Sequence, residues 1–499
     1  MKTTKYIMAL AAASLMLTSA CSDDFLDVKN NTGEPLEEYY TTQEHIDEAL
    51  VAAYDPLHWP DWGLDQYNAL NIDAEVLGDN FWVGGSDKND MKNWHMLFNF
   101  EADAENTYAS LWTVDYSGVK RCNDLLKYLG WAVLTDSARV ACEYQARALR
   151  VYYYNNLWHY FGNIPFFLEN LTSPYTAPQL KADEVYENLI VELEQLADDN
   201  KLPFRWDDKN CGRISQAMIY MMYAEMVMYQ NDQARYPKAL EYMKKIINSS
   251  DYDLVSDYAS IWETAGEWSK EAIWEINYND ANNERGWSSP LAIGGTVMPT
   301  LISPNGLKGE GLTQDGWGFL PVRLETLNKF SAGDKRLDAT VWDLRDIVEY
   351  NNRYQDTHLW LKKYRAQDAN NAAAKGDMNL NYNNNLRVYR YAEALLNAAE
   401  LILPSDPAQA AKWVSLVRER AGLKAVSSVT LDDIINERDL EFMGEGKRYF
   451  DLVRTGKAAS VLVPDTYGYR TNTWNPTKKY IPIAQAELDS DPALVQNEY

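Results

Sequence analysis

The sequence predicts a largely α-helical fold in which helices form the scaffold and long irregular loops lie upon it. Apolar residues recur with helical periodicity in most segments of the chain. Two helix pairs carry small residues where the helices of a tetratricopeptide hairpin approach each other. Two long regions lack this periodicity and are rich in tryptophan, glycine and asparagine. We therefore expect an all-α protein with only minor short strands.

The N-terminal segment has the features of a secretory signal. A basic start is followed by an apolar stretch over 7–17 and then by small residues next to Cys21. The stretch is too short to span a bilayer, and a small residue before cysteine suits a peptidase that cuts before a lipid-modified cysteine. We expect 1–20 to be a signal peptide with a lipobox, and Cys21 to carry the lipid. The alternative is an ordinary thiol after an ordinary cleavage site.

The rest of the chain, 21–499, is expected to fold as one large domain in two parts. Its 46% hydrophobic content is sufficient for a large core, and no later apolar run is long enough for a membrane-spanning helix. We expect an N-terminal helical part over about 21–280. A loop-rich insertion followed by a C-terminal helical part should occupy about 281–499.

Helices are predicted in order along this chain. The clearest covers 136–161, where Cys142, Ala146, Leu149 and Tyr153 fall on one face before Asn-Ile-Pro ends the run. The other expected helices cover 36–54, 104–129, 182–197, 214–229, 237–247, 386–401, 408–421 and 431–453. The tetratricopeptide-like hairpins are expected over 219–247 and from Tyr391 into the helix after Pro407.

The exceptions to helical periodicity cover 55–100 and 279–382. Loops of this length inside a compact domain are usually functional or disordered, and these contain too many aromatic residues for simple disorder. We therefore expect a binding site on them.

Charge and residue counts exclude several functions. The net charge of -26 repels phosphate backbones, which argues against nucleic acid and against polyanionic glycans as ligands. The five histidines are scattered, so no histidine metal site and no cofactor are expected. The acidic residues are compatible with a structural calcium ion, although no EF-hand-like loop is present. Cys122 and Cys142 are expected to be buried thiols, with a disulfide between them as the alternative.

Several separated motifs occur in an order that is more specific than any one of them. They are Phe25-Leu26-Asp27, Ala146 to Arg150 with Tyr160 to Pro165, Gly212-Arg213, Tyr391 to Glu400, Val417 to Leu423, and Glu437-Arg438 through Glu441, Glu445-Gly446, Arg448 and Asp451 to Arg454. This ordered set resembles the SusD/RagB family of outer-membrane nutrient-binding lipoproteins. The resemblance spans nearly the whole mature chain.

The resemblance implies a function without catalysis. It implies a lipid-anchored outer-membrane protein, facing the cell exterior, that captures a neutral glycan. The glycan, an oligosaccharide or polysaccharide, would pass to a partner SusC-like TonB-dependent transporter. Two alternatives remain: a peptide-binding member of the RagB branch, and a glycoside hydrolase with two carboxylates.

An acidic cluster in the C-terminal part could be mistaken for an active site. Glu437, Glu441 and Glu445 lie four residues apart on one expected helix face, with Arg448 and Asp451 beyond. We interpret them as partners of arginines such as Arg438, Arg448 and Arg454, which would join helices together.

The candidate binding residues come from the two loop regions. A sugar ring has an apolar C–H face and a polar rim, so its receptor needs flat aromatic rings beside amides and carboxylates. Trp59 and Trp62 are weaker candidates. The main candidates are Trp82 with Asp79 and Asn80, Trp287 with Asn283, Trp317 with Asp315, and Trp94.

Overall fold

The computed structural model describes residues 33–63, 66–281, 285–308, 316–346 and 349–499. Helices dominate these residues and the strands form only three two-stranded sheets within them, which confirms the predicted fold class. No helix in the described ranges is long and apolar enough to cross a bilayer. The expected signal peptide and Cys21 lie outside the described residues, as do Asn283 and Asp315.

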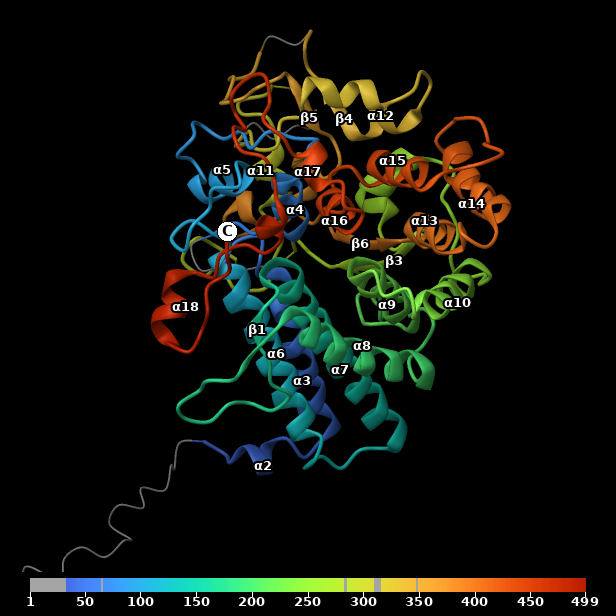
Figure 1. Cartoon of the computed structure of the whole chain (residues 1–499). Coiled ribbons are helices and arrows are strands. Elements are labelled where there is room, and N and C mark those ends of the chain that lie inside the picture. The colour runs from blue at the N-terminus through green and yellow to red at the C-terminus, as the bar shows by residue number, and fades with distance from the viewer. Residues whose placement is uncertain (1–32, 64–65, 282–284, 309–315, 347–348) are drawn as a thin grey trace, which may run out of the picture.

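Long helices form the lower part of the molecule in Figure 1. They are α3 (Gln43–Tyr54), α6 (Ala109–Tyr128), α7 (Asp136–Phe161) and α8 (Ala182–Asp199), each packed on its neighbours. Helix α7 has the predicted bounds because local signals set both ends. The Thr135 side chain accepts a hydrogen bond from the Ala138 N–H, and Gly162 follows with a φ of 68°. Cys122 and Cys142 are separate buried thiols in these helices.

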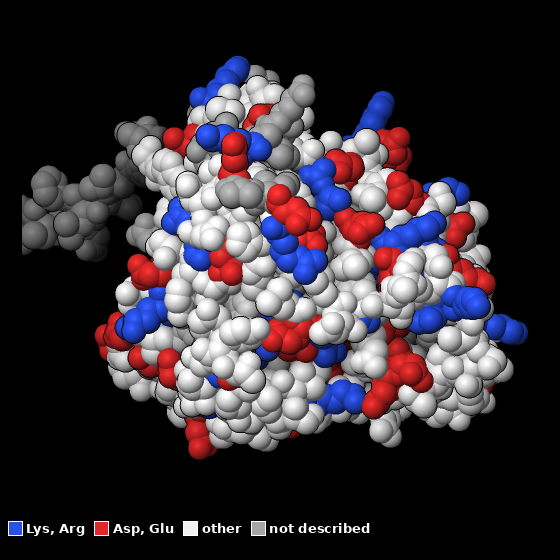
Figure 2. Space-filling view, turned by 90° about the horizontal axis from the view of Figure 1, so that it is seen from above, with Lys and Arg blue, Asp and Glu red and all other residues white. Residues whose placement is uncertain are grey.

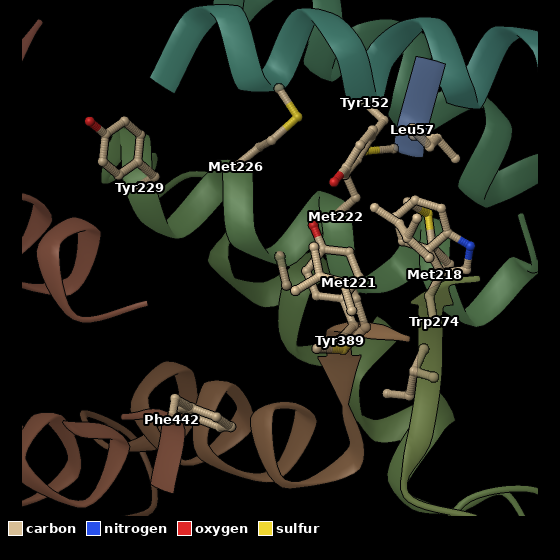
Figure 3. Packing of buried hydrophobic residues seen from close by; sticks show 14 of the residues in the cluster. Leu57, Tyr152, Met218, Met221, Met222, Met226, Tyr229, Trp274, Tyr389 and Phe442 are labelled. Carbon is tan, nitrogen blue, oxygen red and sulfur yellow. The ribbon is translucent and has the colours of Figure 1, made fainter. Parts of the chain in front are cut away.

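Both predicted hairpins are present and lie against each other. The first is α9 (Gln216–Gln230) with α10 (Tyr236–Ile247), and the second is α13 (Tyr391–Ile402) with α14 (Pro407–Arg420). Helix α10 packs on α13. Figure 3 shows the methionines of α9, Met218, Met221, Met222 and Met226, among Tyr152, Trp274 and Tyr389. Helix α9 is buried on nearly all sides. Flexible methionine side chains suit this position because they fill irregular space in a core.

Three predicted helices need correction. The helix expected over 36–54 is divided into α2 (Leu36–Tyr39) and α3 (Gln43–Tyr54). The helix expected over 386–401 begins as strand β6 (Leu386–Arg390), which pairs with β3 (Ala272–Ile276) in an antiparallel sheet. This pairing is a tertiary contact, which local periodicity cannot reveal. The helix expected over 431–453 is divided into α15 (Leu431–Phe442) and α16 (Arg448–Arg454). Gly444 and Gly446 separate them, with φ values of 85° and 77°.

The two loop regions contain short elements that the sequence did not predict. They form the upper layer in Figure 1: α4 (Leu70–Leu77), α5 (Lys92–Phe98), α11 (Met298–Ile302), α12 (Lys335–Thr340), β4 (Val341–Asp343) and β5 (Leu359–Leu361). Residues 81–85 run antiparallel to 319–322, with bridges from Phe81 to Val322 and from Gly84 to Phe319. This contact joins the two loop regions.

Short elements complete the fold. They are α2 (Leu36–Tyr39), η2 (Asp55–His58), β1 (Ile164–Pro165), β2 (Gln179–Leu180), η3 (Tyr258–Trp262), η4 (Thr264–Gly266), η5 (Leu324–Lys329), η6 (Asp368–Asn370), η7 (Met378–Leu380), α17 (Ala458–Val461), η8 (Pro476–Lys479) and α18 (Gln485–Ser490).

Candidate functional site

Four aromatic side chains from the two loop regions meet at the surface. We call Trp62, Tyr67, Trp287 and Trp317 the aromatic cluster. The rings of Trp287 and Trp317 stack with centroids 5.9 Å apart, and those of Trp62 and Tyr67 stack at 4.5 Å. Edge-to-face contacts join the two pairs at 5.5 and 5.4 Å. Trp287 is 41% exposed and the other three are half-buried, so the cluster presents ring surface to solvent.

Backbone contacts hold Trp317 in place. Its backbone N–H donates to the carbonyl of Thr300, within α11, at 2.7 Å. Glycines flank it on both sides. A Cβ on Gly316 would come within 2.3 Å of the Ser303 carbonyl oxygen, and Gly318 has a φ of 73°. These two positions therefore require glycine, and together they fix the backbone that presents the indole ring.

A buried ion pair holds the other half of the cluster. The guanidinium of Arg285 donates to both carboxylate oxygens of Asp61, at 2.7 and 3.1 Å, and to the Trp62 carbonyl at 2.9 Å. Asp61 also accepts from the N–H groups of Trp62 and Val297, each at 2.8 Å. Because both ions are buried and fully hydrogen-bonded, the pair keeps the two loops in register.

Polar groups lie at the edge of the cluster. The carboxylate of Asp377 accepts from the Trp287 N–H at 2.8 Å. Burial raises the pKa of Tyr67, and the nearby carboxylate of Asp90 raises it further, so Tyr67 carries a neutral hydroxyl. Rings with apolar faces, a hydroxyl and carboxylates beside them suit a ligand that is apolar on its face and polar at its rim.

Three of the predicted site residues are inside the protein, which corrects the expectation that they face a ligand. Trp82 is only 2% exposed and lies edge-on against Phe98. Asn80 is buried and donates to Asp439 at 2.8 Å. Trp94 is buried against Phe319. Trp82 and Trp94 are thus part of the hydrophobic core, together with Phe319 from the other loop region.

Asp79 also forms ion pairs within the protein. Its carboxylate accepts from Lys329 at 2.9 Å and from Arg448 at 2.8 Å. Burial alone would raise the pKa of Asp79, but Lys329 and Arg448 outweigh it and hold the pKa well below its ordinary value. The carboxylate thus joins loop to scaffold and does not lie in the aromatic cluster.

The sequence identified the cluster only in part. Trp287 and Trp317 were main candidates and the structure stacks them together; their role in binding stays a prediction. Trp62 was a weaker candidate, and Tyr67 was not singled out. The ion pair between Asp61 and Arg285, which holds the loop of Trp62 in the cluster, joins residues 224 positions apart. No local sequence pattern therefore indicates it. Asn283 and Asp315 lie outside the described residues.

The acidic cluster of the C-terminal part is a buried ion-pair network, as predicted, but with different arginines. Glu441 bonds Arg336 at 3.3 Å, Arg390 at 3.1 Å and also Arg420. Burial would raise the pKa of Glu441, yet these arginines lower it to about 2. Glu445 bonds Arg390 and Lys363.

The three arginines expected in those roles have other partners. Arg438 bonds Asp451 at 2.8 Å, and Arg448 bonds Asp79. Arg454 bonds Glu400 and Asp451. Arg454 and Asp451 both lie in α16, whereas the other three pairs connect separate elements. The structural interpretation therefore stands, while the assignment of partners is corrected.

Two other features of the described residues bear on chemistry. A cavity of about 120 Å³ lies inside the scaffold, and its lining includes His159, Glu225, Tyr389 and Lys447. Within the described ranges, no three His, Cys, Asp or Glu side chains gather as metal ligands would. Figure 2 shows acidic and basic side chains interspersed on the face seen from above, with uncharged surface between them.

The fold and the site together define a helical scaffold protein that displays a partly exposed aromatic cluster. Residues 338–499 match the model of the SusD family. The solved structure of surface glycan-binding protein A from Bacteroides uniformis is 59% identical, with 91% of this chain and 99% of that chain covered and a TM-score of 0.85.

Two further relatives agree. Surface glycan-binding protein A from Bacteroides thetaiotaomicron, solved in complex with laminarihexaose, is 52% identical over 92% of this chain and 100% of that chain, with a TM-score of 0.87. The starch-binding protein SusD of the same organism is 25% identical over 420 residues, covering 73% of this chain and 74% of that one. This chain belongs to the SusD family.

Proposed function

We propose that this protein captures a neutral glycan on its surface through the aromatic cluster and performs no chemistry on it. The observation that carries the proposal is the stacked pair of Trp287 and Trp317, which is held rigidly and partly exposed. An indole face covers the C–H face of a pyranose, while Asp377 and Tyr67 lie within the same surface. Because the rings are already in place, little ordering opposes binding.

The ligand class that we propose is a β-1,3-glucan. A structure 52% identical to this chain was solved with laminarihexaose, and a laminarin-binding SusD-like protein is 27% identical with a TM-score of 0.83. A β-1,3-linked chain of glucose is neutral, which agrees with an acidic protein that disfavours anionic ligands.

The proposal also includes the membrane anchor and the transport partner. Lipid on Cys21 would anchor the protein in the outer membrane, facing the exterior, and a SusC-like TonB-dependent transporter would receive the bound glycan. The buried ion pairs of Glu437, Glu441 and Glu445 support the absence of catalysis, because these carboxylates are occupied by arginines and lysine.

The test uses the chain from residue 22 onward, which lacks the lipid site. Migration in native gels that contain laminarin should slow, whereas gels that contain starch or no polysaccharide should leave it unchanged. Titration calorimetry with laminarihexaose should then show saturable binding, and an oligopeptide mixture should show none. The protein should release no reducing sugar from laminarin. Binding of peptides alone, or release of sugar, would overturn the proposal.

A further inference from the structure

A second group of exposed aromatic residues lies beyond the aromatic cluster. We call Tyr354, Tyr467 and Tyr469 the tyrosine patch. The rings of Tyr467 and Tyr469 are parallel within 10°, with centroids 5.9 Å apart, and Tyr354 meets Tyr469 at 5.7 Å. Tyr467 is 51% exposed, and the other two are half-buried. The patch thus offers ring surface that the scaffold does not need for its own core.

The tyrosine patch is held as firmly as the first cluster. The carboxylate of Asp465 accepts from the N–H groups of Tyr467 at 2.7 Å and Tyr469 at 3.2 Å. Both rings rest edge-on against the buried indole of Trp82, at 5.6 and 5.1 Å. Rings fixed in this way lose little freedom when a ligand covers them.

The two aromatic surfaces are connected through one short segment. The Gly85 N–H donates to the Gly318 carbonyl at 2.8 Å, directly after Trp317, and the Gly85 carbonyl accepts from the Tyr354 N–H at 2.9 Å. The carboxylate of Asp90 accepts from the Ser86 N–H at 2.8 Å, so Asp90 lies beside this segment. The His95 ring meets Tyr354 at 5.6 Å. Gly85 therefore places Tyr354 next to the backbone that follows Trp317, with Asp90 at the same segment.

The surroundings of the tyrosine patch favour a polar ligand with apolar faces. The carboxylate of Glu325 lies beside Tyr467 and raises its pKa, and Arg323 stacks over the Trp82 indole at 4.1 Å. Tyrosine hydroxyls with one acid and one base at the edge can bond sugar hydroxyls, while the phenol faces cover the sugar ring. Arg323 and Glu325 form an ion pair at 4.0 Å, and a purely apolar protein segment would remove this pair from water without adding a hydrogen bond to it.

We propose that the tyrosine patch is a second contact site for the same glycan chain, engaged only by chains long enough to pass Asp90. This inference rests on the proposed function. It predicts that the protein distinguishes long from short β-1,3-glucans, because two weak contacts on one chain combine into stronger binding.

The test compares laminarin with laminaritriose as ligands of the chain from residue 22 onward. Tyr467→Ala should weaken laminarin binding about fivefold to tenfold and leave laminaritriose binding unchanged. Tyr175→Ala, at a 71% exposed tyrosine elsewhere, should change neither. Thermal melts check that each variant is folded, and Tyr467→Phe should restore laminarin binding if the ring face is the contact.

The outcomes separate the two proposals. If Tyr467→Ala leaves laminarin affinity unchanged, or weakens both ligands equally, the second contact site is rejected while glycan capture stands. If Trp317→Ala leaves both affinities unchanged, glycan capture at the aromatic cluster fails.

Discussion

The buried ion-pair network around α15 and the aromatic cluster on the loops contrast in almost every respect. The network holds many titratable groups at spacings that resemble an active site, yet arginines and lysine occupy them and water is excluded. The aromatic cluster contains no motif, yet its rings meet solvent. The comparison shows that in this protein the clustered charged residues join the scaffold, and that residues without any recognisable spacing form the partly exposed aromatic surface.

The largest expected effect comes from breaking the network. Arg390→Leu leaves Glu271, Glu441 and Glu445 buried with fewer cations, which should lower the free energy of unfolding by about 3–5 kcal/mol. Urea unfolding measures this free energy in the variant and in the parent protein. Arg345→Leu removes an arginine whose ion pair is exposed, and should cost at most about 1 kcal/mol. Equal losses in the two variants would show that the network does not stabilise the fold.

A pH dependence sharpens the contrast between paired and unpaired carboxylates. Burial raises the pKa of Glu75 to about 8, although it accepts from the Gly444 and Gly446 N–H groups. The folded state therefore keeps a proton that the unfolded state releases, and stability should fall as the pH rises from about 5 to 8, by at most about 1.4 kcal/mol per unit. Urea unfolding at several pH values should show a shallower decline in Glu75→Gln. Parallel curves would contradict this role of Glu75.

Substitutions in the aromatic cluster should lower the affinity for glycan more than they lower the free energy of unfolding. Trp317→Ala removes one ring of the stacked pair, so affinity for laminarihexaose should fall by about 2 kcal/mol, or roughly 30-fold. Calorimetry measures the loss. Trp131→Ala, at another half-buried tryptophan that stacks on Tyr128, should leave the affinity unchanged. A similar loss in both variants would indicate a general effect of tryptophan removal.

The smallest effect is expected from a conservative change. Trp287→Phe keeps an aromatic face but reduces its area, so affinity should fall by about 0.5–1 kcal/mol, which is twofold to fivefold. Comparison with Trp287→Ala under the same conditions separates the contribution of stacking from that of ring size. An identical loss in both would mean that the phenyl ring does not replace the indole as a contact.

Signals within each segment of the sequence explain the parts of the fold that the sequence predicts correctly. Helix α7 was placed correctly because its periodicity, its Thr135 cap and Gly162 all lie within the segment. Strand β6 was missed because its partner β3 is more than a hundred residues away. The division between α15 and α16 lies at Gly444 and Gly446, which have positive φ and where a Cβ would come within 2.6 Å of Leu361 and 2.8 Å of Asn71, both distant in sequence.

The site was less predictable than the fold, for the same physical reason. Loop tryptophans could be selected by composition, but burial separates Trp82 and Trp94 from Trp287 and Trp317, and burial is decided by contacts across the chain. The four-residue spacing of Glu437, Glu441 and Glu445 correctly indicated ion pairs. Their partners, such as Arg336 and Arg390, come from other elements and could not be read from spacing.

The ion pair between Asp61 and Arg285 has a consequence for how such proteins diversify. All four rings of the aromatic cluster precede residue 338, whereas the stretch that marks the family begins there. Under the proposed function, the four rings of the aromatic cluster therefore lie outside the segment that matches the family model. Exchange of the two loops that this salt bridge joins could redirect a descendant to another nutrient while its hallmark sequence stayed intact.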